Sequence, residues 1–96
     1  MKRGTTSSGF SYEYDVQRLD DMRFVDVLSV IMDDEEQEFD RLKATSKAME
    51  MLLGCELKNK LYDHIGQSHE GRVPYMALQQ ELQEIMAAPG EDAEKN

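Results

Sequence analysis

The chain has no tryptophan, a single cysteine and few basic residues among its 96 residues. Because Cys55 is alone, a disulfide within the chain is excluded. Lys and Arg number 11 against 20 Asp and Glu, which gives a formal net charge of -9. A chain this acidic repels phosphate backbones, so we predict no nucleic-acid partner.

Long hydrophobic runs are also missing. The densest apolar stretch, residues 24–32, is interrupted by Asp26 and Ser29 and is too short to cross a bilayer. The first eight residues include Lys2 and Arg3 but no apolar run behind them, which is not the pattern of a signal peptide. We therefore predict a soluble, cytoplasmic protein with no membrane partner.

Catalytic and metal-binding motifs are absent as well. No phosphate-binding glycine loop, nucleophile elbow or metalloprotease motif occurs. The spacing of the plausible metal ligands matches no zinc signature; they are Cys55, Asp63, His64, His69 and Glu70. The loop that begins at Gly66 does not match a calcium-binding EF-hand loop. Gly66 and Ala77 occupy its first and twelfth positions, where carboxylates are required. We predict a protein that is not an enzyme and that holds no cofactor or metal.

The N-terminal region shows an alternating pattern. Phe10, Tyr12, Tyr14 and Val16 alternate with polar residues, which predicts a half-buried strand. Residues 2–6 are the candidate partner strand across the Ser8-Gly9 turn signal. The pattern predicts a β-hairpin at about residues 2–16, with its aromatic face against the helices or another chain.

Four later segments have helical patterns. Residues 22–32 follow the N-cap candidates Asp20 and Asp21, but they carry too many apolar and β-branched residues for one helix face, so a strand stays an alternative. Asp34 and Gln37 have capping-box spacing before the second helix, which Gly54 should end in the left-handed conformation. The predicted apolar face of that helix comprises Phe39, Leu42, Ser46, Met49 and Leu53, widened by Thr45, Ala48 and Leu52.

The third and fourth helices are shorter. Leu57, Leu61 and Ile65 mark the third, which Gly66 should close. Pro74 suits the first turn of the fourth, and Pro89-Gly90 should end it. The apolar stripe of the fourth helix comprises Tyr75, Leu78, Leu82 and Ile85, with Met86 beside it.

The predicted fold is mainly α: about four helices in a small bundle with an N-terminal β-hairpin. A single helical domain should span residues 1–88, and an acidic flexible tail residues 89–96. We expect the centres of the apolar stripes to form the core; they are Leu42, Leu53, Leu61 and Leu82.

Several short motifs carry a family resemblance. They are the segments 8–15 and 19–22, Leu52-Leu53-Gly54, Leu61-Tyr62-Asp63-His64 and Gly71-Arg72-Val73-Pro74, followed by the last amphipathic helix. In this order they resemble the small acidic tail-assembly chaperones of long-tailed phages and prophages of Gram-positive bacteria. The resemblance implies a non-catalytic protein of the bacterial host cytoplasm that holds the tape measure protein soluble during tail morphogenesis.

Such a chaperone would bind an amphipathic helical client on an adaptable apolar surface, for which methionine is suited. We expect partner contacts on the first and last helices: Phe24, Val27, Ile31, Leu78, Ile85 and Met86. Residues 22–32 are either core or interface, and self-association stays open. The alternative function is an acidic adaptor, antitoxin-like or DNA-mimicking, that neutralises a basic partner. A DNA mimic needs an ordered double row of carboxylates. We interpret the acidic residues here as dispersed, with the densest clusters at residues 33–36 and in the tail, and this favours the chaperone.

Overall fold

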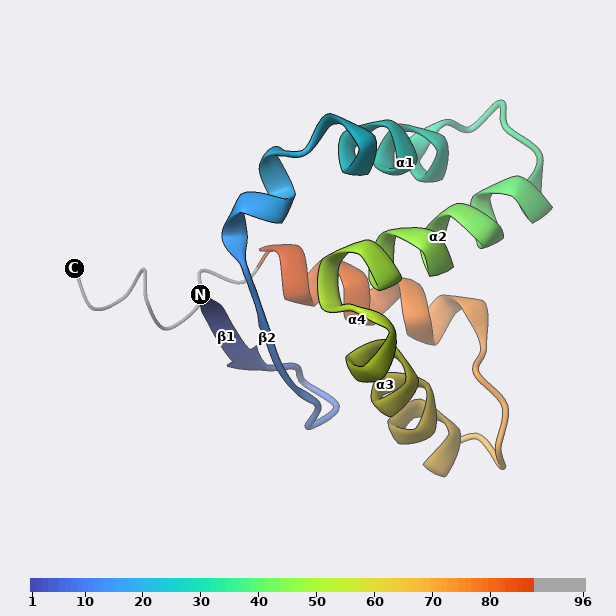
Figure 1. The fold of residues 1–96 in the computed structure, drawn as a ribbon. Coiled ribbons are helices and arrows are strands. Elements are labelled where there is room, and N and C mark those ends of the chain that lie inside the picture. The colour runs from blue at the N-terminus through green and yellow to red at the C-terminus, as the bar shows by residue number, and fades with distance from the viewer. Residues whose placement is uncertain (88–96) are drawn as a thin grey trace.

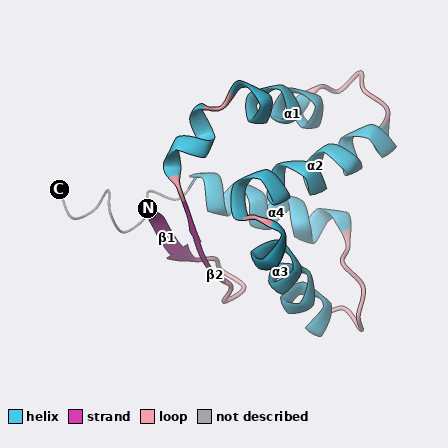
Figure 2. Cartoon of the chain, viewed as in Figure 1, coloured by secondary structure: helices cyan, strands magenta, loops and turns pink. Residues whose placement is uncertain are grey.

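The computed structural model describes residues 1–87. Its elements are strands β1 (Lys2–Thr5) and β2 (Ser11–Tyr14), the 3-10 helix η1 (Val16–Asp20), and helices α1 (Met22–Met32), α2 (Glu38–Leu53), α3 (Cys55–Gln67) and α4 (Tyr75–Ala87). The mainly helical fold with an N-terminal hairpin is confirmed (Figures 1 and 2). The predicted tail at 89–96 and the helix end at Pro89-Gly90 lie outside the described residues.

The hairpin lays an aromatic face on the helices. β1 and β2 are antiparallel, with Lys2 opposite Tyr14. Phe10, Tyr12 and Tyr14 are all buried, as their alternation predicted. Val16, predicted to share this face, is 47% exposed instead. The strand ends before it, because the Asp15 carboxylate accepts the N–H of Gln17 and starts η1.

Residues 22–32 form a helix, so the strand alternative is wrong. Asp21 caps α1 by accepting the N–H of Arg23. The capping box predicted for α2 does not form, because Gln37 is the N-cap residue and makes no side-chain capping bond. Asp33, not Asp34, is the acceptor in this loop, and it binds the N–H of Glu35.

Gly54 joins α2 directly to α3. Its N–H donates to the carbonyl of Glu50, and its own carbonyl accepts the N–H of Lys58. Its φ of 87° is positive, as predicted, but its ψ of 162° lies outside the left-handed helical region. Gly66 does not close α3, which continues to Gln67. Its carbonyl instead accepts the N–H groups of His69 and Gly71 and so shapes the following loop.

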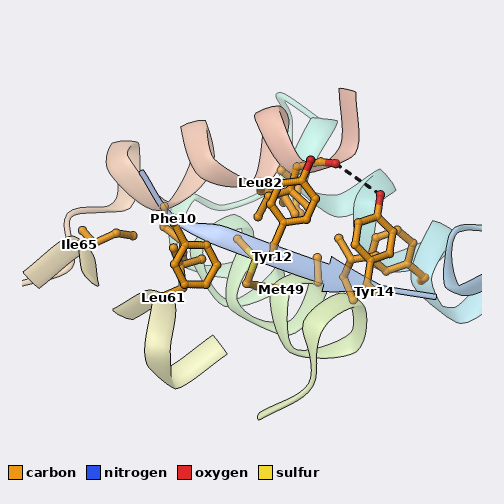
Figure 3. Close-up of a cluster of buried hydrophobic side chains, with 13 residues drawn as sticks. Phe10, Tyr12, Tyr14, Met49, Leu61, Ile65 and Leu82 are labelled. Carbon is orange, nitrogen blue, oxygen red and sulfur yellow. Dashed lines mark hydrogen bonds between the residues drawn. The ribbon is translucent and has the colours of Figure 1, made fainter. Parts of the chain in front are cut away.

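Helix α2 is central to the packing and contacts α1, α3, α4 and β2. In Figure 3 the rings along β2 lie among side chains of the helices. The predicted core positions Leu61 and Leu82 are buried, whereas Leu42 and Leu53 are only half-buried. Phe39, predicted on the core face, is 68% exposed. The buried residues of α2 are Thr45, Ala48, Met49 and Leu52, all members of the predicted apolar face, so the face is confirmed there but is centred away from Phe39 and Leu42.

Candidate partner-binding surface

Four of the six predicted contact residues lie in the core. Phe24 and Ile31 of α1 and Leu78 and Ile85 of α4 are each 6% exposed or less, and they belong to one buried cluster. Val27 and Met86 pack against that cluster and are half-buried. The six residues therefore form no common surface in this conformation, because the fold uses their apolar side chains internally.

The apolar side chains that do reach solvent are different ones. On α1, Met22 is 66% exposed, Val25 38% and Met32 78%. Phe39 in the first turn of α2 is 68% exposed, and Met76 on α4 is 69% exposed. The remaining large exposed ones are Met1 and Val16. The richest of these surfaces is on α1, where three exposed apolar residues share one helix.

These three residues follow a helical spacing. Met22, Val25 and Met32, with the exposed Ser29 between the last two, step by three, four and three residues, which places them on one side of α1. We call Met22, Val25, Ser29 and Met32 the outer stripe. The opposite side carries Phe24, Leu28 and Ile31 and packs inward. The excess of apolar residues in α1 was visible in the sequence. It is explained by two separate apolar stripes on opposite sides of the helix.

Packing against α2 decides which face of α1 is inside. The Arg41 side chain of α2 donates from Nε to the carbonyl of Ile31, 3.1 Å away, and so satisfies a carbonyl at the end of α1. Arg18 of η1 donates from Nη1 to the carbonyls of Met51 and Leu52. These bonds tie the C-terminal end of α1, and the η1 helix that precedes α1, to α2. Figure 1 shows α1 along α2, on the side away from α3.

Negative charge is concentrated around the outer stripe. Residues 20–40, which we call the acidic arm, hold nine of the 20 acidic residues and one of the 11 basic ones, Arg23. The rest of the chain is nearly balanced, with 11 acidic and 10 basic residues. The interpretation of the acidic residues as dispersed is therefore wrong, because nearly half of them lie in residues 20–40. All nine acidic residues of the arm are exposed; they are Asp20, Asp21, Asp26, Asp33, Asp34, Glu35, Glu36, Glu38 and Asp40.

A second polar cluster holds the hairpin on the helices. Ser8 in the turn donates from Oγ to Oε2 of the buried Glu81 at 2.9 Å, and His64 Nε2 lies 3.1 Å from the Ser8 carbonyl. Ser7 donates its N–H and hydroxyl to the Glu84 carboxylate, and these bonds lower the pKa of Glu84. A cavity of about 70 Å³ lies here, lined in part by His64, His69 and Glu81. We assign this cluster to hairpin docking.

The candidate ligands and the cysteine make no reactive arrangement among the described residues. No group of three His, Cys, Asp or Glu side chains in residues 1–87 is placed to hold a metal ion. The exposed Cys55 thiol donates to Glu50 Oε2 at 3.3 Å, and this bond raises the pKa of the thiol. His64 instead contacts Ser8, so Cys55 and His64 do not pair as nucleophile and base.

Among residues 1–87, no helix is both long enough and apolar enough to cross a membrane. In comparisons with known proteins, no family model, curated protein or solved structure matches the chain. The tape-measure chaperone family accordingly stays a prediction from the sequence motifs.

Proposed function

We propose that this protein is a non-catalytic phage tail-assembly chaperone. It binds an amphipathic helical segment of the tape measure protein and keeps that protein soluble in the bacterial host cytoplasm until tail subunits enclose it. One observation carries the proposal: α1 has a second apolar face, the outer stripe, that its own fold leaves exposed. An apolar helix face exposed on a small domain is suited to receive the apolar face of another helix.

The composition of the outer stripe supports a client with a repeated, variable stripe. Two of its three apolar residues are the methionines Met22 and Met32. Methionine is unbranched and polarisable, so it adapts to differently shaped apolar surfaces. A tape measure protein presents many similar helical stripes along its length, and an adaptable contact surface can serve several of them. The net charge of the chaperone would keep the complex soluble.

The test is co-expression with the tape measure gene from the same tail-gene cluster. The expected result is a soluble tape measure protein that co-purifies with this chain, including at high salt, because burial of apolar surface drives the contact. The double variant Met22→Gln, Met32→Gln removes the apolar tips of the stripe and should lose the client. Met76→Gln is the matched control, since Met76 is equally exposed but lies on α4.

Three results would count against this function or against the surface assigned to it. The tape measure protein could remain insoluble with the unmodified chain present. The α4 control could lose the client while the α1 variant keeps it, which would place the contact elsewhere. Co-purification that disappears at high salt would favour the acidic adaptor, for which the charge of the acidic arm is the supporting observation.

A further inference from the structure

The fold does not use most of the charge on the acidic arm. Within residues 1–87, the arm's carboxylates take part in no ion pair, whereas elsewhere Arg3 pairs with Glu13 and Lys58 with Glu50. Asp21 and Asp33 accept backbone N–H bonds, and the other seven carboxylates of the arm have no such role. Mutual repulsion among exposed like charges opposes the compact state. Packing within the chain therefore does not account for this concentration of charge.

The charge borders the outer stripe at several points. Asp20 and Asp21 precede the first stripe residue, Met22, and Asp33–Glu36 follow the last one, Met32. Asp26 is one turn from both Met22 and Ser29 and thus lies beside the stripe. The C-terminal end of α1 adds the negative end of a helix dipole to the Asp33–Glu36 cluster. An apolar face over three turns of helix thereby has negative charge at both ends and along the side of Asp26.

We propose that the outer stripe docks an amphipathic helix whose own apolar face is bordered by lysine and arginine. The apolar faces supply the contact area, and the charge borders select the partner and speed its approach. This deepens the proposed function and depends on it for the helical nature of the client. It specifies which segments of a client bind: those whose stripes have basic rather than acidic flanks.

A second copy of this chain is a poor occupant of the same face. Two outer stripes brought together would also bring together two acidic arms, each with nine acidic residues and one basic residue. Opposed like charges cost free energy and prevent wrong pairings. The inference therefore also predicts that the stripe does not mediate self-association.

The experiment uses the full chain and three labelled synthetic helical peptides. All three carry the same leucine stripe; the residues bordering it are lysine in the first, glutamine in the second and glutamate in the third. Fluorescence anisotropy measures binding at about 0.1 M and about 1 M salt, where the Debye length falls from about 10 Å to about 3 Å. At low salt, we expect the lysine peptide to bind about tenfold more tightly than the glutamine peptide, and the glutamate peptide more weakly than both.

High salt should remove the preference while binding of the lysine and glutamine peptides persists. Two charge variants test whether the acidic arm causes the preference for the lysine peptide. The arm variant Asp26→Asn, Asp34→Asn, Glu36→Gln should reduce the preference for lysine. The matched control Glu56→Gln, Asp63→Asn, Glu70→Gln changes net charge equally on exposed residues of α3 and the following loop, and it should leave the preference intact. Circular dichroism verifies that each variant is folded.

Equal binding of the three peptides would overturn the inference, and so would an equal effect of the two charge variants, which would indicate net charge alone. A change of oligomeric state in the Met22→Gln, Met32→Gln variant, measured by sedimentation, would assign the stripe to a second copy instead. These failures are distinguishable from failure of the proposed function. A tape measure protein kept soluble without any peptide preference contradicts only this inference, whereas a clear preference without solubilisation contradicts only the chaperone role.

Discussion

Tyr14 links the hairpin to the end of α4. It lies opposite Lys2 in the hairpin, and both side chains reach carbonyls in the last turn of α4: Tyr14 Oη donates to Ile85 and Lys2 Nζ to Met86. The Ile85 carbonyl needs an outside donor, because the N–H that an α-helix would supply to it belongs to position 89, which is proline. The hairpin thus caps the helix on which it packs.

Tyr14→Phe should lower the free energy of unfolding by about 1 kcal/mol at neutral pH, since the buried Ile85 carbonyl loses its donor. Burial, and secondarily the neighbouring Tyr12, raise the pKa of Tyr14 from 10.0 to about 12. The folded state therefore holds this proton more tightly than the unfolded state. The resulting stability is complete below pH 10.0 and is lost as the pH rises toward about 12.

Urea unfolding of the two proteins between neutral pH and pH 12 measures this effect. The wild-type free energy should fall more steeply than that of Tyr14→Phe above pH 10. Lys2 acts in the opposite sense, because burial lowers its pKa and the cost of its charged form fades as pH rises. Since both proteins retain Lys2, comparing their curves isolates the tyrosine. Parallel curves would contradict the assignment of the alkaline loss to Tyr14.

The junction between α2 and α3 depends on one backbone conformation. Gly54 has φ 87° and ψ 162°, a combination that is almost restricted to glycine. A Cβ added there would meet no atom within 4 Å, so any cost of Gly54→Ala comes from backbone strain alone. We expect this substitution to destabilise the protein by about 1–3 kcal/mol.

Gly66→Ala provides the comparison for the same chemical change within a helix. Its Cβ would make ordinary contacts, at 3.5 Å from Gly71, and alanine favours the helical conformation by about 0.5–1 kcal/mol over glycine. Thermal unfolding should therefore move in opposite directions for the two variants. A Gly54→Ala protein as stable as the wild type would mean that α2 and α3 meet through a different, unstrained backbone.

Across the whole molecule, local patterns predicted which elements form and the buried faces of the hairpin, α3 and α4, but not the centre of the α2 face or the side of α1 that packs inward. The period-two aromatics and the 3–4 spacings were sufficient for the hairpin and the four helices. They assigned Thr45 and Ala48 only to the margin of an α2 face that included Phe39 and Leu42, whereas Thr45 and Ala48 are fully buried and Phe39 is exposed. Thr45 and Ala48 are small and only weakly apolar, so hydrophobicity alone does not identify them as the centre of the buried face.

The candidate site shows the same limit. α1 has two apolar stripes, and the stripe with Phe24 and Ile31 was predicted to contact a partner. Only its packing on α2 turns that stripe inward and leaves Met22 and Met32 outside. The concentration of acids in residues 20–40, by contrast, can be counted from the sequence. It becomes informative once the exposed stripe within the same segment is known.

The hairpin and helices should unfold together, because they share one core. Leu61 of α3 is fully buried in the cluster that also contains Phe10 and Tyr12 of the hairpin region and Leu82 of α4. Leu61→Ala should therefore cost about 2–4 kcal/mol through lost burial and a residual cavity. Leu42→Ala should cost less, about 1 kcal/mol, because its side chain is only half-buried.

Two optical signals follow the two parts of the molecule during denaturation. With Tyr62 and Tyr75 of the helices replaced by phenylalanine in every protein compared, the near-ultraviolet tyrosine signal comes from Tyr12 and Tyr14 of the hairpin, and far-ultraviolet circular dichroism reports the helices. In both leucine variants the two transitions should coincide, with a lower midpoint for Leu61→Ala, as expected of one cooperative unit. If Leu61→Ala lost the tyrosine signal well before its helices, the hairpin would be a separate unit that merely rests on the bundle. Equal midpoints for the two variants would mean that the half-buried face of α2 contributes as much as the core.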